Sequence, residues 1–114
     1  MANVSSRDVS EKLRVITISE RMDIQGTEKI EGTFASLVTG NRNIIVDLSG
    51  VTFLSSVGIR ALVANGKSLK TNGGKMVLVV GENAAVSKTL KTTCTDALLP
   101  MFNNLDSAQA ALSS

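Results

Sequence analysis

The chain has 114 residues with a formal net charge of +2, and it contains no histidine, no tryptophan, no tyrosine and one cysteine. Without histidine there is no general base of the usual kind at neutral pH, no Ser-His-Asp or Cys-His pair, and no imidazole ligand for zinc or haem. A lone Cys94 forms neither an internal disulfide nor a multi-cysteine metal site. Three classes stay open: an enzyme that uses carboxylates or lysine, a phosphate-handling protein, and a binding module.

Size and composition favour one globular domain over residues 1–114. Hydrophobic residues make up 43% and charged residues 19%, which is typical of a chain that folds around its own core. The basic residues are scattered, so we expect no nucleic acid partner. The N-terminus lacks an apolar signal-like run, and the longest strongly apolar stretch, 77–80, is too short for a transmembrane segment. We therefore expect a cytoplasmic protein.

The first half of the chain predicts two strands, a helix and a third strand. Residues 4–9 and 13–18 predict two strands joined by a polar turn, and in the second strand Val15 and Thr17 alternate with Ile16 and Ile18. Thr27 is a suitable cap for a helix that ends at Gly40-Asn41. The apolar face of that helix consists of Ile30, Phe34, Leu37 and Val38. The run 44–48 is apolar on both faces, as in a central parallel strand.

In the second half of the chain, predicted strands continue to alternate with predicted helices. An apolar run at 51–54 precedes a helix that stops at 72–74, and its apolar stripe contains Ile59, Leu62, Val63, Gly66 and Leu69. A buried strand at 76–80 precedes a helix with Val86, Leu90 and Cys94 on one face. Pro100 places a strand at 98–102 on the sheet edge, because proline cannot donate to a ladder. Asp106 and Gln109 form a capping box for a last helix.

This order of strands and helices predicts an α/β fold. Right-handed βαβ crossovers require a mixed, mostly parallel sheet, here of four to five strands flanked by about four helices.

The sequence contains one partial nucleotide-binding motif and one partial catalytic motif, and neither is complete. Gly66-Lys67-Ser68 lacks the first glycine of a phosphate-binding Walker A loop, because Ala61 stands there. Ser56-x-Gly58 supplies half of a nucleophile elbow, but Leu54 replaces its first glycine and no histidine is present to accept the serine proton. We expect no catalytic residues, cofactor or metal.

Ser55 and Ser56 lie where a strand gives way to a helix, and two interpretations are open. Either serine can cap the helix by accepting a backbone N–H bond, which stabilises it by about 1 kcal/mol. A serine at an exposed helix N-terminus is also a place where a phosphate is well tolerated, because free N–H groups and the helix dipole face it.

Residues 47–59, with the sequence DLSGVTFLSSVGI, resemble the signature of STAS domains, particularly the bacterial anti-sigma factor antagonists. The similar family pattern is a hydrophobic strand ending in DLS, then x-V-x-F, then DSSGL or DSTGL at the start of a helix. The resemblance extends over nearly the whole chain. Residues 20–23 (ERMD) stand where the family has GELD, and 72–76 (NGGKM) match its glycine-rich entry to a strand.

The resemblance implies a phospho-switch. Unphosphorylated members of the family bind an anti-sigma factor that is also a GHKL-type serine kinase, and phosphorylation releases them. A PP2C-type phosphatase resets the switch. By position, Ser56 is the implied phosphoacceptor, with Ser55 as the second choice, and Asp23, Ser55, Ser56 and Gly58 form the implied partner-binding surface.

Three positions depart from the family pattern. Ser55 replaces the usual Asp, Val57 replaces a second Ser or Thr, and Glu20 replaces a Gly. A rival hypothesis keeps the fold and drops the modification: a STAS scaffold or regulatory subunit of a transporter or signalling complex. A third hypothesis, an enzyme without histidine, predicts a deep pocket with convergent polar groups.

Overall fold

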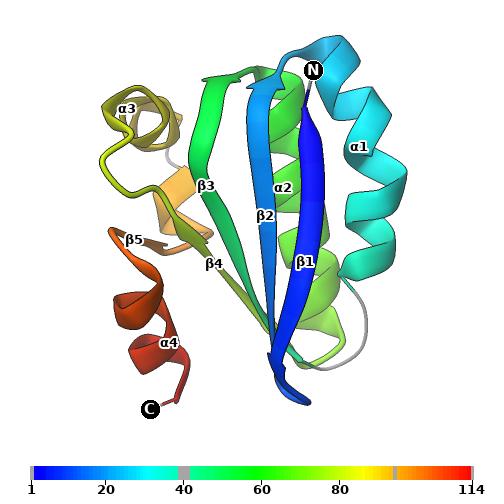
Figure 1. Cartoon of the computed structure of the whole chain (residues 1–114), viewed down its shortest axis with the longest axis vertical. Coiled ribbons are helices and arrows are strands. Elements are labelled where there is room, and N and C mark those ends of the chain that lie inside the picture. The colour runs from blue at the N-terminus through cyan, green and yellow to red at the C-terminus, as the bar shows by residue number, and fades with distance from the viewer. Residues whose placement is uncertain (1, 39–41, 94, 114) are drawn as a thin grey trace.

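The computed structural model describes residues 2–38, 42–93 and 95–113. Figure 1 shows a sheet with helices on both of its faces. The elements in chain order are β1 (Asn3–Ser10), β2 (Leu13–Met22), α1 (Ile24–Leu37), β3 (Asn43–Leu54), α2 (Ser56–Thr71), β4 (Lys75–Val79), α3 (Ala84–Thr92), the 3-10 helix η1 (Thr95–Ala97), β5 (Met101–Phe102) and α4 (Leu105–Ser113).

The sheet has five strands in the order β1-β2-β3-β4-β5. β1 pairs antiparallel with β2, and every other pair is parallel. The register aligns Val15, Ile45 and Val77 across three strands. The prediction of an α/β fold with a mixed, mostly parallel sheet is confirmed, because each parallel pair needs a crossover helix between its strands.

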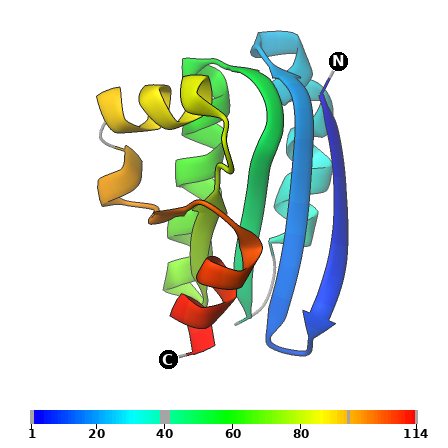
Figure 2. The same ribbon diagram turned by 60° about the vertical axis from the view of Figure 1, so that its left-hand side comes forward.

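The two faces of the sheet are covered unequally. Helices α1, α2 and α3 pack on one face, where the alternate strand residues Ile16, Val46 and Leu78 are buried with Phe34. On the opposite face α4 packs through Ala108 against a smaller cluster that includes residues of β2, β3 and β4. Figures 1 and 2 show α4 beside β4 and β5, while the front of β1 and β2 carries no helix.

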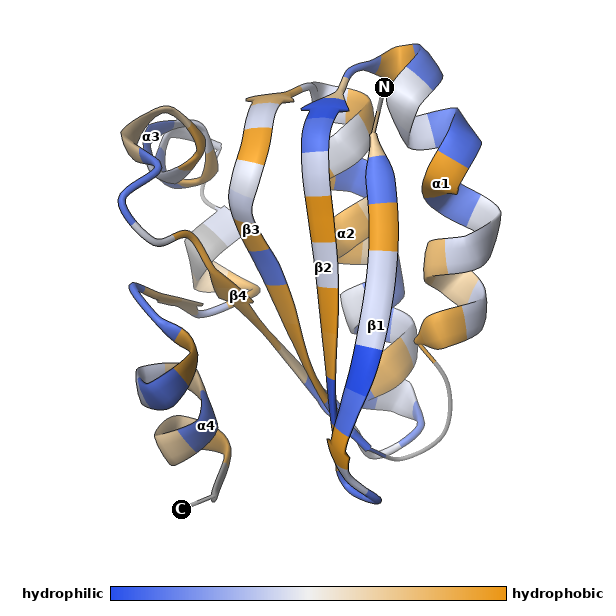
Figure 3. Cartoon of the chain, viewed as in Figure 1, coloured by the Kyte–Doolittle hydropathy of each residue, from blue (hydrophilic) through white to orange (hydrophobic). Residues whose placement is uncertain are grey.

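Hydropathy along β1 and β2 agrees with this arrangement. Figure 3 shows β1 as mostly polar, and nearly all of its residues are exposed. In β2 the buried positions Val15, Ile16 and Ile18 are followed by a half-buried or exposed polar run at 19–21. The apolar stripe predicted for the first helix is also found, since Ile30 and Phe34 are buried. Among the described residues, Phe34 is the only aromatic one that is fully buried in the core.

Helix α1 begins earlier than predicted, and its cap is different. Asp23, not Thr27, is the N-cap: its Oδ1 accepts the backbone N–H of Gly26 at 2.7 Å. Thr27 lies inside the helix, buried, and its hydroxyl has no hydrogen-bond partner in the described part of the chain. The helix ends at Leu37, and the predicted stop at Gly40-Asn41 lies outside the described residues.

Strand β3 joins the two apolar runs that the sequence separates. It continues through Ser49-Gly50, where its pairing with β2 shifts register. Asn83 supports this irregular stretch by donating its Nδ2 to the carbonyl oxygen of Val51 at 2.6 Å. Its Oδ1 accepts the N–H of Val86 and so caps α3. A single side chain therefore joins the irregular stretch of β3 to the start of α3.

In the C-terminal part of the chain, the predicted last strand and the predicted capping box both differ from the structure. The predicted strand 98–102 contracts to Met101–Phe102, because the N–H groups of Leu98 and Leu99 bond back to the carbonyl oxygen of Thr95. β5 is nevertheless the edge strand, as Pro100 predicted. The last helix begins at Leu105, so Asp106 and Gln109 lie inside it and form no capping box across its start. Asn104 accepts the N–H of Ser107 instead. Cys94 lies outside the described residues.

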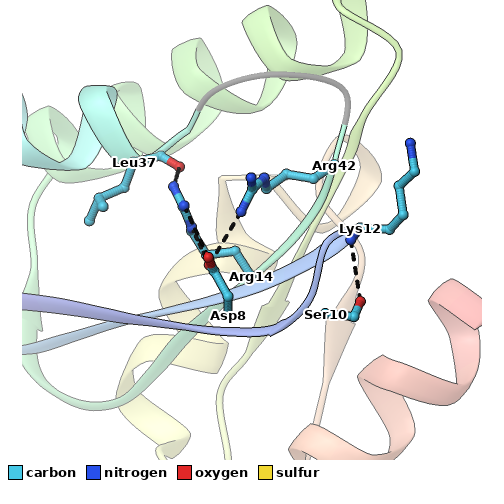
Figure 4. Close-up of polar contacts among 6 residues, drawn as sticks. All are labelled: Asp8, Ser10, Lys12, Arg14, Leu37 and Arg42. Carbon is cyan, nitrogen blue, oxygen red and sulfur yellow. Dashed lines mark hydrogen bonds and ion pairs between the residues drawn. The ribbon is translucent and has the colours of Figure 1, made fainter.

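Charged groups tie together the end of the sheet where β2 and β3 begin (Figure 4). Asp8 on β1 accepts hydrogen bonds from Arg14 Nε at 2.7 Å and from Arg42 Nη1 at 3.3 Å. Arg14 also donates to the carbonyl oxygen of Leu37 at the end of α1, at 2.8 Å. This network joins β1, β2, α1 and the residue before β3.

Candidate functional site

The predicted site residues meet at the opposite end of the sheet. Strands β2 and β3 end side by side, with Met22 paired to Leu54, and α1 and α2 each start within two residues of those ends. The N-caps of the two helices, Asp23 and Ser55, consequently lie close together (Figure 1, top). The N–H of Ser55 donates to the carbonyl oxygen of Met22 at 3.0 Å, which holds the two chain segments in register.

Ser55 and Ser56 have different environments. The Ser55 hydroxyl donates to the Met22 carbonyl at 2.6 Å and accepts the Gly58 N–H at 3.2 Å, so it is the N-cap of α2 and half-buried. Ser56 is the first helical residue and is exposed, and its hydroxyl has no hydrogen-bond partner within the described ranges. The open choice of cap is thereby decided in favour of Ser55, and Ser56 presents a hydroxyl to solvent.

Asp23 is held in its charged form. The N–H of Gly26 and, to a lesser degree, Arg21 keep the pKa of the Asp23 carboxyl below its ordinary value, because both stabilise the carboxylate. Arg21 Nε lies 3.3 Å from Asp23 Oδ2. A negative charge therefore lies at the same hollow as Ser55.

Gly58 lies beneath the surface formed by the other three predicted residues. A Cβ at this position would lie 3.0 Å from Leu54 Cδ1 and 3.2 Å from Met22 Cβ. Gly58 is buried, so its role in this structure is to let the first turn of α2 approach the ends of β2 and β3.

Apolar side chains extend the site beyond the residues that the sequence indicated. Ile24 is 58% exposed and Phe53 is 43% exposed. The Arg21 guanidinium lies 4.8 Å from the centroid of the Phe53 ring, within cation–π range. We call the set Arg21, Asp23, Ile24, Phe53 and Ser55, together with the exposed Ser56 that follows Ser55, the docking surface.

Sequence reasoning missed Arg21, Ile24 and Phe53 as members of this surface. The sequence does contain an indication that Phe53 is exposed. Consecutive residues of a strand point to opposite faces, and the neighbouring Leu54 belongs to the core. Exposed aromatic and arginine side chains are the types that most often dominate protein–protein binding energy.

The hollow on this surface is open rather than deep. Asp23, Ile24, Gln25, Phe53 and Ser55 line it, and Asp23 is the only titratable group among them. No group of three or more potential metal ligands occurs in the described part of the chain. The shape suits contact with another protein better than it suits catalysis on a small molecule.

The model of the STAS domain family matches residues 5–108. The chain belongs to the STAS domain family. A search of curated protein sequences gave no significant match. Among the described residues, no helix is both long and apolar enough to cross a membrane.

Solved structures share the fold over the full length of this STAS domain. An anti-sigma factor antagonist from Mycobacterium paratuberculosis is 24% identical, with a TM-score of 0.87 over 100% of this chain and 96% of that one. An anti-sigma-factor antagonist (STAS) domain protein from Planctomyces limnophilus is 25% identical, with a TM-score of 0.85 and 98% coverage of each chain. SpoIIAA of Bacillus in the phosphorylated form is 13% identical, with a TM-score of 0.69, covering 96% of this chain and 99% of that one. The expected STAS fold is confirmed.

Proposed function

We propose that this STAS domain is a cytoplasmic, non-enzymatic anti-sigma factor antagonist. Unphosphorylated, it binds an anti-sigma factor that is also a GHKL-type serine kinase, and phosphorylation of Ser56 releases it. A PP2C-type phosphatase restores the binding form. The observation that carries the proposal is the exposed hydroxyl of Ser56 at the start of α2, which has no hydrogen-bond partner in the described part of the chain. Ser56 directly follows Ser55, which lines the hollow together with the exposed Ile24 and Phe53.

The division of work between the two serines supports this mechanism. Ser55 holds the cap with its own hydroxyl, so modification of Ser56 leaves the capping bond to Gly58 in place. The family pattern usually has Asp at this position. Asp and Ser are about equally good N-caps, so Ser55 caps the helix as well as that Asp would. What the substitution removes is one negative charge beside the phosphoacceptor.

Phosphate at Ser56 changes the docking surface in charge and in size. It adds about 1.5 to 2 negative charges at neutral pH to the residue that follows Ser55, which lines the hollow together with Asp23. The positive end of the α2 dipole stabilises the phosphate on this protein. A partner that presents an acidic or nucleotide-bearing face to Ser56 is then repelled.

The first experiment locates the phosphate. The protein, its Ser56→Ala variant and its Ser55→Thr variant are incubated with the GHKL-type kinase and ATP and analysed by mass spectrometry. We expect one phosphate at Ser56, none on Ser56→Ala, and normal modification of Ser55→Thr, which keeps a capping hydroxyl. Phosphate on residue 55, or on neither residue, would overturn this part of the proposal.

A second experiment separates the switch from a permanent scaffold. Ser56→Asp is expected to weaken kinase binding at least tenfold, because one fixed charge desolvated in an interface costs more than about 1.4 kcal/mol. Ser68→Asp, on the exposed part of α2, is the charge-matched control and should leave binding unchanged. Unweakened binding by Ser56→Asp contradicts the switch and favours a STAS scaffold or regulatory subunit.

A further inference from the structure

A second hollow lies far from Ser56. It has a volume of about 280 Å³, is partly open to solvent, and is lined by the C-terminal half of α2, the start of β4 and residues 97–100. Figure 2 shows the orange segment that contains residues 97–100 alongside the green helix α2. Lys70 in this hollow is fourteen residues along α2 from Ser56, a separation of about 20 Å at the rise of an α-helix.

Two glycines allow close packing in the wall of this hollow. A Cβ on Gly66 would lie 2.6 Å from Leu99 Cδ2, so a side chain there would force the Leu99 side chain to shift. A Cβ on Gly74 would collide with the carbonyl oxygen of Arg42 and lie 2.7 Å from Leu69 Cδ1. The tight approach of backbone and side chains at both glycines builds a defined wall.

The lining is apolar except at one side. Met76 and Leu99 are buried in the wall, and Leu98 is 58% exposed at the rim. An apolar side chain exposed to this extent beside a concave apolar surface loses water contact when a ligand fills the space. Burial of this apolar area favours binding.

The polar side of the hollow carries positive charge. Lys70 and Lys75 line it, and no acidic group is found among its described lining residues. Neither lysine ammonium group forms an ion pair or hydrogen bond within the described ranges. The last carbonyl groups of α2 already accept hydrogen bonds from the N–H groups of residues 72–74. They are therefore not the partners of the two ammonium groups.

We propose that this hollow binds a small carboxylic acid with an unbranched apolar tail. The carboxylate lies between Lys70 and Lys75, and the tail lies against Met76, Leu98 and Leu99. A volume of about 280 Å³ equals that of roughly nine water molecules at about 30 Å³ each, which is enough space for an eight-carbon acid. The two lysines exclude a cationic ligand by repulsion and give a neutral ligand no equivalent contact.

Octanoate is the probe for this proposal. Titration calorimetry of the full chain, below the concentration at which octanoate forms micelles, should show saturable one-to-one binding. Octanol and octylamine, which share the tail without the carboxylate, should bind at least about tenfold more weakly. Absence of saturable octanoate binding, or equal binding of octanol, would overturn the proposal.

Matched lysine variants test the position of the ligand. Lys70→Met and Lys75→Met should each weaken octanoate binding by about tenfold. Lys67→Met removes the same charge from an exposed position of α2 outside the hollow and should leave binding unchanged. Equal affinity in all three variants would contradict the assigned site. An acidic protein segment that binds here while octanoate does not would also overturn the proposal.

Discussion

At the scale of the residue, Glu20 shows how a departure from the family pattern is accommodated. Its φ is 69°, in the left-handed region, and the pairing of β2 with β3 shifts register between Glu20 and Arg21. Glycine adopts this conformation without steric cost, which explains why the family pattern has Gly at this position. The side chain of Glu20 is used nonetheless, since its Oε2 accepts a hydrogen bond from Asn3 Nδ2 at 2.6 Å.

Substitutions at Glu20 should reverse the usual strand preferences. Valine is ordinarily a better strand former than glycine, but a β-branched side chain is strained at positive φ. We expect Glu20→Val to lower the free energy of unfolding by about 1 to 2 kcal/mol and Glu20→Gly to change it by less than about 0.5 kcal/mol. Urea titration measures both variants. If Glu20→Val is as stable as Glu20→Gly, the backbone at this bulge is not left-handed.

At the scale of the element, Asn83 links β3 to α3 through contacts distant in sequence. Its amide nitrogen reaches the Val51 carbonyl, 32 residues away, while its amide oxygen caps the helix that follows it. A strand of twelve residues with a register shift needs such support, because the shift interrupts the regular ladder.

Two variants at Asn83 separate its two functions. Asn83→Asp keeps an acceptor for the Val86 N–H but brings a carboxylate, which cannot donate, to the Val51 carbonyl. Asn83→Ala removes both contacts, and we expect it to lower the free energy of unfolding by about 2 kcal/mol. In hydrogen exchange, Asn83→Asp should retain the protection of α3 that Asn83→Ala loses. Unchanged stability in Asn83→Ala would show that the clamp does not stabilise the fold.

At the scale of the whole molecule, two carboxylates secure opposite ends of the sheet. Hydrogen bonding by Arg14 lowers the pKa of Asp8, and the N–H of Gly26 together with Arg21 lowers that of Asp23. Both native pKa values therefore lie below the ordinary value of 3.8. The unfolded chain binds protons at these groups more readily than the folded one, so their stabilisation is present above that value and is lost as the pH falls through the native pKa values.

Acid titration of stability tests this coupling. Between about pH 5 and about pH 2, the unfolding midpoint of the native protein should fall more steeply than that of an Asp8→Asn, Asp23→Asn double variant. The two midpoints should converge at the acid end, where both aspartates are protonated. Asn at position 23 retains the cap of α1, which limits other effects of the substitution. Parallel curves would show that these carboxylates do not drive the acid loss.

Much of the fold follows from local patterns. The alternation of β-branched runs and amphipathic helices, and the edge strand at Pro100, agree with the structure because side-chain period and proline chemistry act over a few residues. For the first and last helices, the caps predicted from the sequence are wrong. Asp23 and Asn104 take those roles because strand pairing and packing decide where each helix begins.

The sequence by itself determined the α/β class, the STAS resemblance and the position of the serine pair. Only the tertiary structure decided that Ser55 is the cap and Ser56 the exposed hydroxyl, because the group that binds Ser55 is a carbonyl 33 residues earlier in the chain. The same holds for the docking surface and the lysine-flanked hollow. Each is assembled from segments distant in sequence, whose approach depends on how the strands pair and how the helices pack.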